Sequence, residues 1–359
     1  MIDRRNPMKK IILLITLFFA ALYGLTACSS EKAPSSQKAG LKIVAVNFAA
    51  YDFARQIVKD NGEITMLLRP GSEAHSYEPS PKDIQAIQNS DLFIYTGGDS
   101  DDWAEKVLHS MEGKKPAVFK MTDAVTLREE EITEGMTEDH HHHDDEEHHH
   151  EEDKEHHHDD DKEHHHDDKE HHHDDKEHHH DEEPELDEHV WTSPKNAVLI
   201  VQALEKTLSS LDKEKESIFK KNTDEYVEKL NKLTADFQEV IDSAKRKEII
   251  VGDRFPFLYF VKDFGLTYYA AFPGCATETE ANPATVAFLI DKVKEDQIPV
   301  VFHIELSDER MSRSIAEATG AKNELLNAVH NISDAQFKAG ITYIDLMEHN
   351  VMVLKEALN

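Results

Sequence analysis

The stretch "KEKESIFKKNTDEYVEKLNKLTADFQEVIDSAKRK", residues 213–247, decides the architecture that the sequence predicts. Apolar side chains recur in it at intervals of three, four and seven residues, which places them on one face of a helix. These side chains are Phe219, Tyr226, Leu230, Leu233, Phe237, Val240 and Ala244. No glycine or proline interrupts the pattern, so we expect one helix of roughly thirty residues, far above the usual length. Such a helix can join two lobes as a stiff strut.

On both sides of this helix, short β-rich runs alternate with helical patterns, which is typical of parallel α/β sheets. We expect strands over 41–47, 63–68, 91–97, 117–121, 248–252, 266–272 and 299–304. Helices are expected over 48–60, 80–90, 103–110, 282–296, 308–319 and 346–358, and another begins at Ser193 and Pro194. The predicted fold class is therefore α/β, with two similar lobes whose parallel sheets are joined by a long rigid helix. Ligands of such folds bind at the carboxyl ends of the strands, here in the cleft between the lobes.

The first 40 residues have the pattern of an export signal followed by a tether. Basic residues precede the apolar run 11–25, which is shorter than most membrane-spanning helices. The run ends in "LTAC", which resembles a bacterial lipobox and implies cleavage after residue 27 and lipidation of Cys28. Residues 28–40 are polar and suit a tether. The alternative is a plain secretory signal in which Cys28 is incidental.

The segment 138–188 is an insert rich in acids and histidines, with 26 Asp and Glu against 4 Lys. It accounts for most of the net charge of −32. Nineteen histidines are interspersed with these acids, and the stretch 160–180 contains no apolar residue. We expect a disordered, exposed segment whose neutral imidazoles collect metal ions. The histidines are His140, His141, His142, His143, His148, His149, His150, His156, His157, His158, His164, His165, His166, His171, His172, His173, His178, His179 and His180.

Two other roles for this insert explain less of the sequence than metal collection does. A solvated acidic run would explain the carboxylates but leave the histidine triplets without a role. An adhesin or metal buffer that uses only the histidines would leave the two-lobed body unexplained. The chain has no basic stripe, so nucleic-acid binding is not expected.

Outside the insert, four potential metal ligands lie where α/β proteins place binding groups. His75 is in a loop rich in Gly and Pro, and His189 comes immediately before a helix. Asp253 and Glu305 each follow a strand of the second lobe. His303 is a possible substitute for Glu305, because residues two apart on a strand face the same side.

Several motifs closely resemble those of the zinc/manganese substrate-binding proteins of bacterial ABC importers, whose zinc members often carry a His- and acid-rich loop. The likeness covers nearly all of the chain that follows the signal. It rests on "LLRPGSEAHSYEPSPKDIQAIQNSDLFIYTGG", "DEHVWTSPKNA", "DFGL", "AEATGA" and "YIDLMEHNVMVLKEAL".

This resemblance implies one metal ion in the cleft, with His75 and His189 as the first two ligands and Glu305 as the late acidic one. Zinc members usually have His at the start of an "H-x-A-F-G-Y" stretch, where this chain has "DRFPFLY". Arg254 is the formal match within one residue, but a guanidinium does not bind cations, so Asp253 is the predicted third ligand and His303 is the alternative.

The resemblance also implies a role without catalysis, in which the chain delivers Zn²⁺ to an ABC permease and its ATPase subunit. Manganese is the alternative, because two imidazoles with two carboxylates suit it, whereas the His-rich insert favours zinc. A metal-dependent hydrolase is less well supported, because the chain lacks "HExxH" and "GxSxG". We expect a monomer attached by lipid to the extracytoplasmic face of the membrane. Cys275 is interpreted as a small buried residue, with a metal-ligand role as the alternative. His109 and His349 are expected at the surface, and His330 is left without a role.

The domain boundaries that follow are a signal peptide over 1–27, a tether over 28–40 and an N-terminal lobe over 41–190 that includes the insert. Helices then occupy 191–246, including the joining helix, and the C-terminal lobe extends over 247–359.

Overall fold

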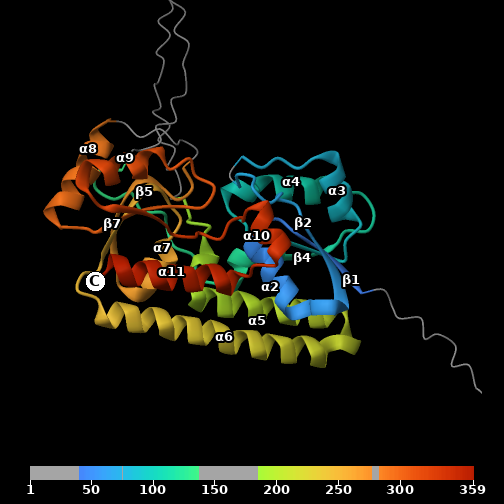
Figure 1. Ribbon diagram of the computed structural model, residues 1–359. Coiled ribbons are helices and arrows are strands. Elements are labelled where there is room, and N and C mark those ends of the chain that lie inside the picture. The colour runs from blue at the N-terminus through green and yellow to red at the C-terminus, as the bar shows by residue number, and fades with distance from the viewer. Residues whose placement is uncertain (1–39, 75, 137–184, 277–282) are drawn as a thin grey trace, which may run out of the picture. The chain divides into compact units, whose positions relative to one another are not determined.

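The structure is a computed structural model that describes residues 40–74, 76–136, 185–276 and 283–359. Residues 41–359 group into one compact unit. Two parallel sheets lie in this unit, with the long helix α6 (Glu216–Ser243) extending beneath both of them (Figure 1). The predicted α/β class with two lobes is therefore confirmed.

The first sheet has the strand order β2-β1-β3-β4, and all its neighbours are parallel. Its strands are β1 (Leu41–Ala45), β2 (Gly62–Met66), β3 (Leu92–Tyr95) and β4 (Ala117–Lys120). The helices between them are α2 (Phe48–Val58), α3 (Pro81–Gln88) and α4 (Asp102–Ser110). Every residue of β3 is buried, which explains its uninterrupted apolar sequence.

The second sheet repeats this plan with the order β6-β5-β7-β8. Its strands are β5 (Glu248–Phe255), β6 (Thr267–Pro273), β7 (Val300–His303) and β8 (Lys322–Leu325). The helices are α7 (Leu258–Phe264), α8 (Pro283–Glu295) and α9 (Arg310–Thr319). Strand β8 was not predicted, because its sequence "KNEL" is short and polar and it pairs only with β7.

The joining helix α6 (Glu216–Ser243) confirms the prediction from the apolar stripe. Phe219, Leu230 and Phe237 on this stripe are buried in the same hydrophobic core. Ala244 ends the helix instead of belonging to it. Helix α5 (Pro194–Leu211) precedes α6 and begins as predicted, because the Ser193 side chain accepts hydrogen bonds from the first free backbone N–H groups.

After the second sheet the chain crosses to the first lobe, where α10 (Asp334–Ala339) lies near α2, and α11 (Tyr343–Ala357) then runs back beneath the second lobe (Figure 1). Asp52 in α2 accepts a 2.8 Å hydrogen bond from the Tyr343 backbone N–H, and Arg55 donates to the carbonyl of Ile341. The final segment therefore belongs to the packing of both lobes, which the predicted boundary 247–359 does not capture.

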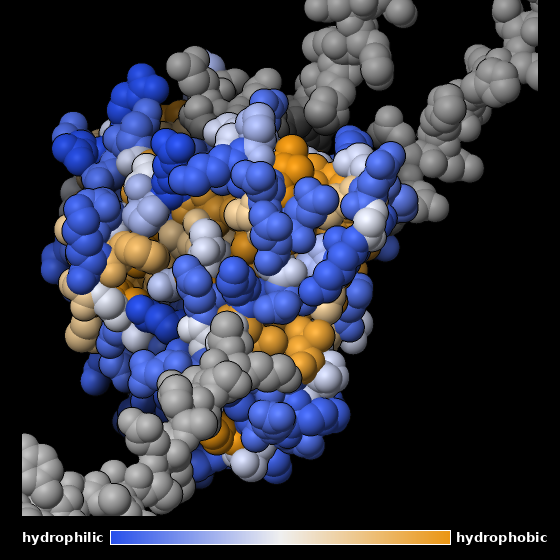
Figure 2. Space-filling model, turned by 90° about the vertical axis from the view of Figure 1, so that its right-hand side faces the viewer, coloured by the Kyte–Doolittle hydropathy of each residue, from blue (hydrophilic) through white to orange (hydrophobic). Residues whose placement is uncertain are grey.

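The face of the protein drawn in Figure 2 is mainly hydrophilic. The face in Figure 2 shows charged and polar side chains with apolar ones in separate patches. Within the described residues, no helix has both the length and the apolar character needed to cross a membrane. The predicted signal 1–27 and the tether 28–39 lie outside the described residues.

Candidate metal centre

The two lobes meet where the segment that follows β8 contacts the loop that follows β2. Gly71 donates its backbone N–H to the carbonyl of Ile332 at 2.8 Å. The Asn331 side-chain amide donates to the carbonyls of Arg69 and Ser72, at 2.7 and 2.8 Å. Phe48, at the start of α2, donates to the carbonyl of His330 at 3.0 Å. These hydrogen bonds fix residues 330–332 of the second lobe against the first.

His189 lies at this junction and is completely buried. Its backbone N–H donates to Asp187 Oδ1 at 2.8 Å, and its ring Nδ1 lies 3.2 Å from the same oxygen. Burial lowers the pKa of His189, but the carboxylates of Asp187, Glu188 and Glu130 outweigh burial and raise it above its ordinary value. Asp187 thus fixes the position of the ring and directs Nδ1 towards a carboxylate.

His330 follows strand β8 and approaches the same point from the second lobe. The ring centroids of His189 and His330 are 4.8 Å apart, with an angle of 80° between the ring planes. Burial lowers the pKa of His330 well below its ordinary value, and the neighbouring His189 and Arg254 add to this effect. His330 is therefore a neutral imidazole at neutral pH, which is the form that binds metal ions.

Glu305 follows strand β7 and fixes the loop that carries His330. Its carboxylate accepts hydrogen bonds from the backbone N–H of Ala328 at 2.6 Å and of His330 at 2.8 Å. Val329, between these two residues, has a positive φ of 62°. A β-branched residue rarely adopts this conformation, so the two hydrogen bonds hold a strained turn in place.

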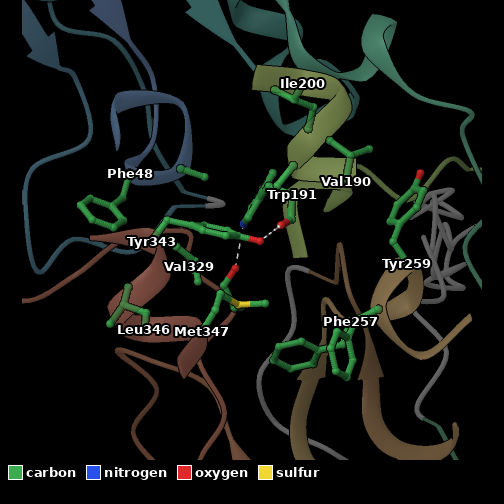
Figure 3. Close-up of a cluster of buried hydrophobic side chains, with 14 of the residues drawn as sticks. Phe48, Val190, Trp191, Ile200, Phe257, Tyr259, Val329, Tyr343, Leu346 and Met347 are labelled. Carbon is green, nitrogen blue, oxygen red and sulfur yellow. Dashed lines mark hydrogen bonds between the residues drawn. The ribbon is translucent and has the colours of Figure 1, made fainter. Parts of the chain in front are cut away.

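Trp191 encloses the histidine pair on one side. Its ring packs edge to face against His189 and His330, with centroid distances of 5.6 and 5.2 Å. The indole N–H donates to the carbonyl of Ala328 at 2.7 Å. Figure 3 shows the Tyr343 hydroxyl directed at the Trp191 carbonyl, to which it donates at 2.8 Å. Packing and hydrogen bonds thus hold both imidazoles in fixed positions.

A small cavity beside His330 is lined by groups from both lobes. Arg254 and Glu305 line it from the second lobe and Glu73 from the first. The Arg254 guanidinium donates to Glu73 Oε1 at 2.9 Å and forms an ion pair between the lobes. Arg254, and not Asp253, is therefore the residue of "DRFPFLY" that faces the cavity.

The structure does not bring the predicted ligand Asp253 to this cavity. Its carboxylate accepts from the backbone N–H of Arg254 at 2.9 Å and hydrogen-bonds Ser307 and the backbone of Ile304. Neighbouring residues on a strand point to opposite faces, and β5 is irregular between Val251 and Arg254. With Arg254 turned to the cavity, Asp253 is directed at the turn after β7.

His303, the predicted substitute, also lies away from the histidine pair. Its Nδ1 is 3.2 Å from Asn323 Oδ1, and its Nε2 is 3.7 Å from Glu309 Oε1. The expectation that His303 and Glu305 share one side is wrong, because β7 ends at His303. Glu305 lies in the following turn, where the period of two no longer holds.

The first predicted ligand, His75, lies outside the described residues. Its neighbours place that part of the chain at the site. Ala74 lines the cavity with Arg254 and His330, and Ala74 and Tyr77 line an adjoining one that also includes His330. Cys28 and the nineteen histidines of the insert also lie outside the described residues.

Comparison with known proteins shows the family of the chain. The family described as "Zinc-uptake complex component A periplasmic" matches residues 43–357. The chain belongs to this family.

Two curated relatives of this zinc-uptake family show how far the likeness extends. The zinc-binding lipoprotein AdcA of Streptococcus pneumoniae is 30% identical over 353 residues, which cover 97% of this chain and 61% of AdcA. The chain thus spans about three fifths of the AdcA proteins that it matches. The high-affinity zinc uptake system protein ZnuA of Bacillus subtilis is 30% identical over 337 residues, and the match covers 93% of both chains.

Solved structures of the zinc-uptake family share the fold. The Zn(II)-bound ZnuA-like domain of S. pneumoniae AdcA has a TM-score of 0.66 at 26% identity and covers 89% of this chain and 99% of that one. The metal-dependent lipoprotein YcdH of B. subtilis has a TM-score of 0.65 at 26% identity, with the same coverage.

His330 is the residue of this family member that sequence reasoning missed. The sequence around His330 does not indicate a metal site, because it places no acid close to this histidine. In the fold, Glu305 lies near His330. Its position could have indicated it, since it follows β8 in the parallel sheet, next to the strand that precedes Glu305. Recognition of β8 as a strand was the missing step.

Proposed function

We propose that this chain is an extracytoplasmic zinc-binding protein that delivers Zn²⁺ to an ABC permease and its ATPase subunit. The observation that carries the proposal is the pair of buried imidazoles at the junction of the lobes, His189 and His330, with ring centroids 4.8 Å apart. The names of the relatives AdcA and ZnuA support zinc as the cargo.

The ligands that we propose are His75, His189 and His330, with Glu305 beside them. His330 replaces Asp253, the third ligand predicted from the sequence. Three imidazole nitrogens suit Zn²⁺, whereas Mn²⁺ prefers more oxygen ligands. Glu305 as a ligand stays a prediction, because a carboxylate oxygen that accepts one hydrogen bond keeps a second lone pair.

The neighbouring charges are consistent with a divalent cargo. The carboxylates of Asp187, Glu188 and Glu305 surround the histidine pair, while Arg254 is neutralised by its ion pair with Glu73. Neutral imidazoles supply no charge to balance Zn²⁺, so these buried carboxylates provide it.

The remaining parts of the chain fit the same role. Cys28 would carry the lipid that holds the protein at the outer face of the membrane, and residues 28–40 would be the tether. The nineteen histidines of the insert would bind several zinc ions weakly near the cleft. The body would act as a monomer that presents one tightly bound ion.

Native mass spectrometry of the metal-free chain, titrated with zinc and separately with manganese, tests the proposal. We expect one tightly held zinc ion at low metal, several weaker ones at higher metal, and no tight manganese. A tight manganese ion with zinc held only weakly would favour a manganese importer. Absence of any tight ion would refute a cargo site between the lobes.

A further inference from the structure

Cys275 is the centre of a second group of metal-ligand side chains. It lies two residues after β6, and its Sγ is within 4.8 Å of ligand atoms of Glu188 and His189. Sγ also lies within 4.8 Å of carboxylate oxygens of Glu130 and Glu185. Sulfur, nitrogen and oxygen ligands thus converge from three distant parts of the sequence.

Backbone hydrogen bonds build this group as a fixed structure. The Cys275 backbone N–H donates to Glu130 Oε1 at 2.9 Å, and the Glu130 N–H donates to the carbonyl of Glu185 at 2.8 Å. The Tyr259 hydroxyl donates to the carbonyl of Asp187 at 2.7 Å. The segments that carry Glu130 and Glu188 are therefore held together independently of any ion.

Gly274 allows Cys275 to approach the His189 ring. A Cβ at Gly274 would lie 3.1 Å from both Cε1 and Nδ1 of His189, which is closer than side chains normally pack. The same Cβ would lie 2.9 Å from the carbonyl oxygen of Phe255. A larger residue here would push the Cys275 turn away from the imidazole.

The group carries buried negative charge that no described lysine or arginine balances. Neither Glu130 nor Glu188 forms an ion pair with a basic side chain within the described residues. A divalent cation among these side chains would supply the missing positive charge.

We propose that Cys275, Glu188 and His189 form a second site, with Glu130 on another side of the thiol, and that this site binds a thiophilic divalent cation such as Zn²⁺. A thiolate selects zinc over magnesium, calcium and manganese, and the imidazole and the Glu188 carboxylate add a nitrogen and an oxygen ligand. On binding, the Cys275 thiol gives its proton to solvent and the sulfur bonds to the metal.

The site has a further consequence that rests on the proposed function. Glu185 follows His180 by only five residues, and His189 belongs to both sites. A zinc ion released by the insert could therefore be bound first at Cys275 and then pass to the histidine pair through His189. The Cys275 site would then be an intermediate binding site between the His-rich insert and the cleft.

Cobalt titration of the full chain carrying Cys28→Ser tests the site. Cys275 is then the only sulfhydryl in the chain, and the insert contributes only nitrogen and oxygen ligands. Thiolate-to-cobalt charge transfer therefore reports Cys275 alone. We expect this absorption to develop and saturate at one ion per chain, and to disappear in Cys275→Ser. Its absence after the insert is fully loaded would overturn the proposal.

Two further variants separate this site from the cargo site. His330→Ala should abolish tight zinc binding and leave the thiolate absorption in place. Glu188→Gln should keep the absorption but shift its midpoint to higher cobalt, by roughly tenfold, because one charged ligand is lost. An unchanged midpoint in both Glu188→Gln and Glu130→Gln would show that the thiol binds cobalt without the proposed partners, and would overturn the site as described.

Protection of the thiol gives an independent measurement. Zinc should slow alkylation of Cys275 in the Cys28→Ser chain, and should do so equally in His330→Ala. Protection that is lost with His330→Ala would mean that zinc in the cleft merely closes access to the thiol, which contradicts a separate site.

Discussion

The carboxylate of Glu305 holds His330 by its backbone. Oε1 of Glu305 accepts the His330 N–H at 2.8 Å, while the His330 ring Nδ1 is 3.6 Å from the same oxygen. Oε2 accepts the N–H of Ala328 at 2.6 Å, so the carboxylate spans the strained residue Val329. The turn after β7 therefore positions an imidazole carried by the turn after β8.

Glu305→Gln should weaken this arrangement while preserving the shape of the side chain. The amide nitrogen cannot accept a hydrogen bond, so either the Ala328 or the His330 N–H loses its partner. We expect a loss of roughly 1–3 kcal/mol in the free energy of unfolding and a fall in zinc affinity of roughly tenfold or more. Urea unfolding and competitive zinc titration measure the two effects. Glu317→Gln, on the exposed face of α9, is the matched control, and equal behaviour of both variants would contradict the role of Glu305.

His189→Ala and His330→Ala should each remove tight zinc binding. Each takes one nitrogen ligand from a small set, so we expect zinc affinity to fall by more than about a hundredfold. Competitive titration against a chelator measures this loss. His109→Ala is the control, because His109 is exposed on α4. Retained tight binding in His330→Ala would show that His330 is not a ligand of the cargo ion.

Arg254→His should raise the affinity for zinc. Arg254 lines the cavity beside His330 and Glu305, so an imidazole there would add a nitrogen ligand where a cation now stands. We expect a gain of roughly tenfold, about 1.4 kcal/mol. Arg254→Gln is the control, since it also breaks the ion pair with Glu73 but adds no imidazole. A lower affinity in Arg254→His than in Arg254→Gln would show that the geometry excludes a ligand at this position.

Long periodic patterns made much of the fold predictable. The stripe on α6 continues over many helical turns, so an error at any one position does not change the interpretation. Buried strands such as β3 are also recognisable in the sequence, because they are uninterrupted apolar runs. Strand β8 could not be recognised, because half-buried polar residues on a strand with only one partner lack both signals.

The site could be predicted only in part, because sequence patterns locate the ends of strands no more precisely than to within a few residues. That precision was enough to place the predicted ligands His189 and Glu305 at the junction of the lobes, where both lie close to His330. It failed for Asp253 and Arg254, which are adjacent and point to opposite faces of an irregular strand. His330 required knowledge of β8 and of contacts with Glu305, which lies 25 residues away in the sequence.

Asp101→Asn should change how stability depends on pH in the metal-free protein. Burial raises the pKa of Asp101, although the backbone N–H groups of Thr96 and Gly97 donate to its carboxylate. Between the unfolded and folded pKa values the folded state holds the extra proton, so the free energy of unfolding falls as pH rises through this interval. Asparagine keeps an acceptor for both N–H groups and carries no charge.

We therefore expect Asp101→Asn to be more stable than the natural protein at pH 7, with the difference vanishing as pH falls to about 3.8 and below. Urea unfolding over this pH range measures it. Asp102→Asn is the matched control, because Asp102 is exposed. A difference of the same size at low and neutral pH would mean that the substitution acts through packing and not through the buried charge.

Deletion of residues 139–181 should leave a folded protein with one tight zinc site. The chain on either side of the deleted segment is already paired. Glu129 and Leu186 form an antiparallel bridge, and the Glu130 backbone N–H donates to the carbonyl of Glu185. Shortening the connection between two paired ends changes the closure entropy only slightly, so we expect a change of less than about 1 kcal/mol in the free energy of unfolding.

Replacement of all nineteen histidines of the insert by serine is the matched control that keeps its length. Native mass spectrometry should show that both variants lose the weak zinc ions and keep the tight one. In cells that carry either variant, zinc uptake should slow only when zinc is scarce. If the tight ion disappears with the deletion but survives the serine replacement, the insert supports the cleft structurally; if both variants lose it, the insert itself supplies ligands to the tight site and is not a separate collector.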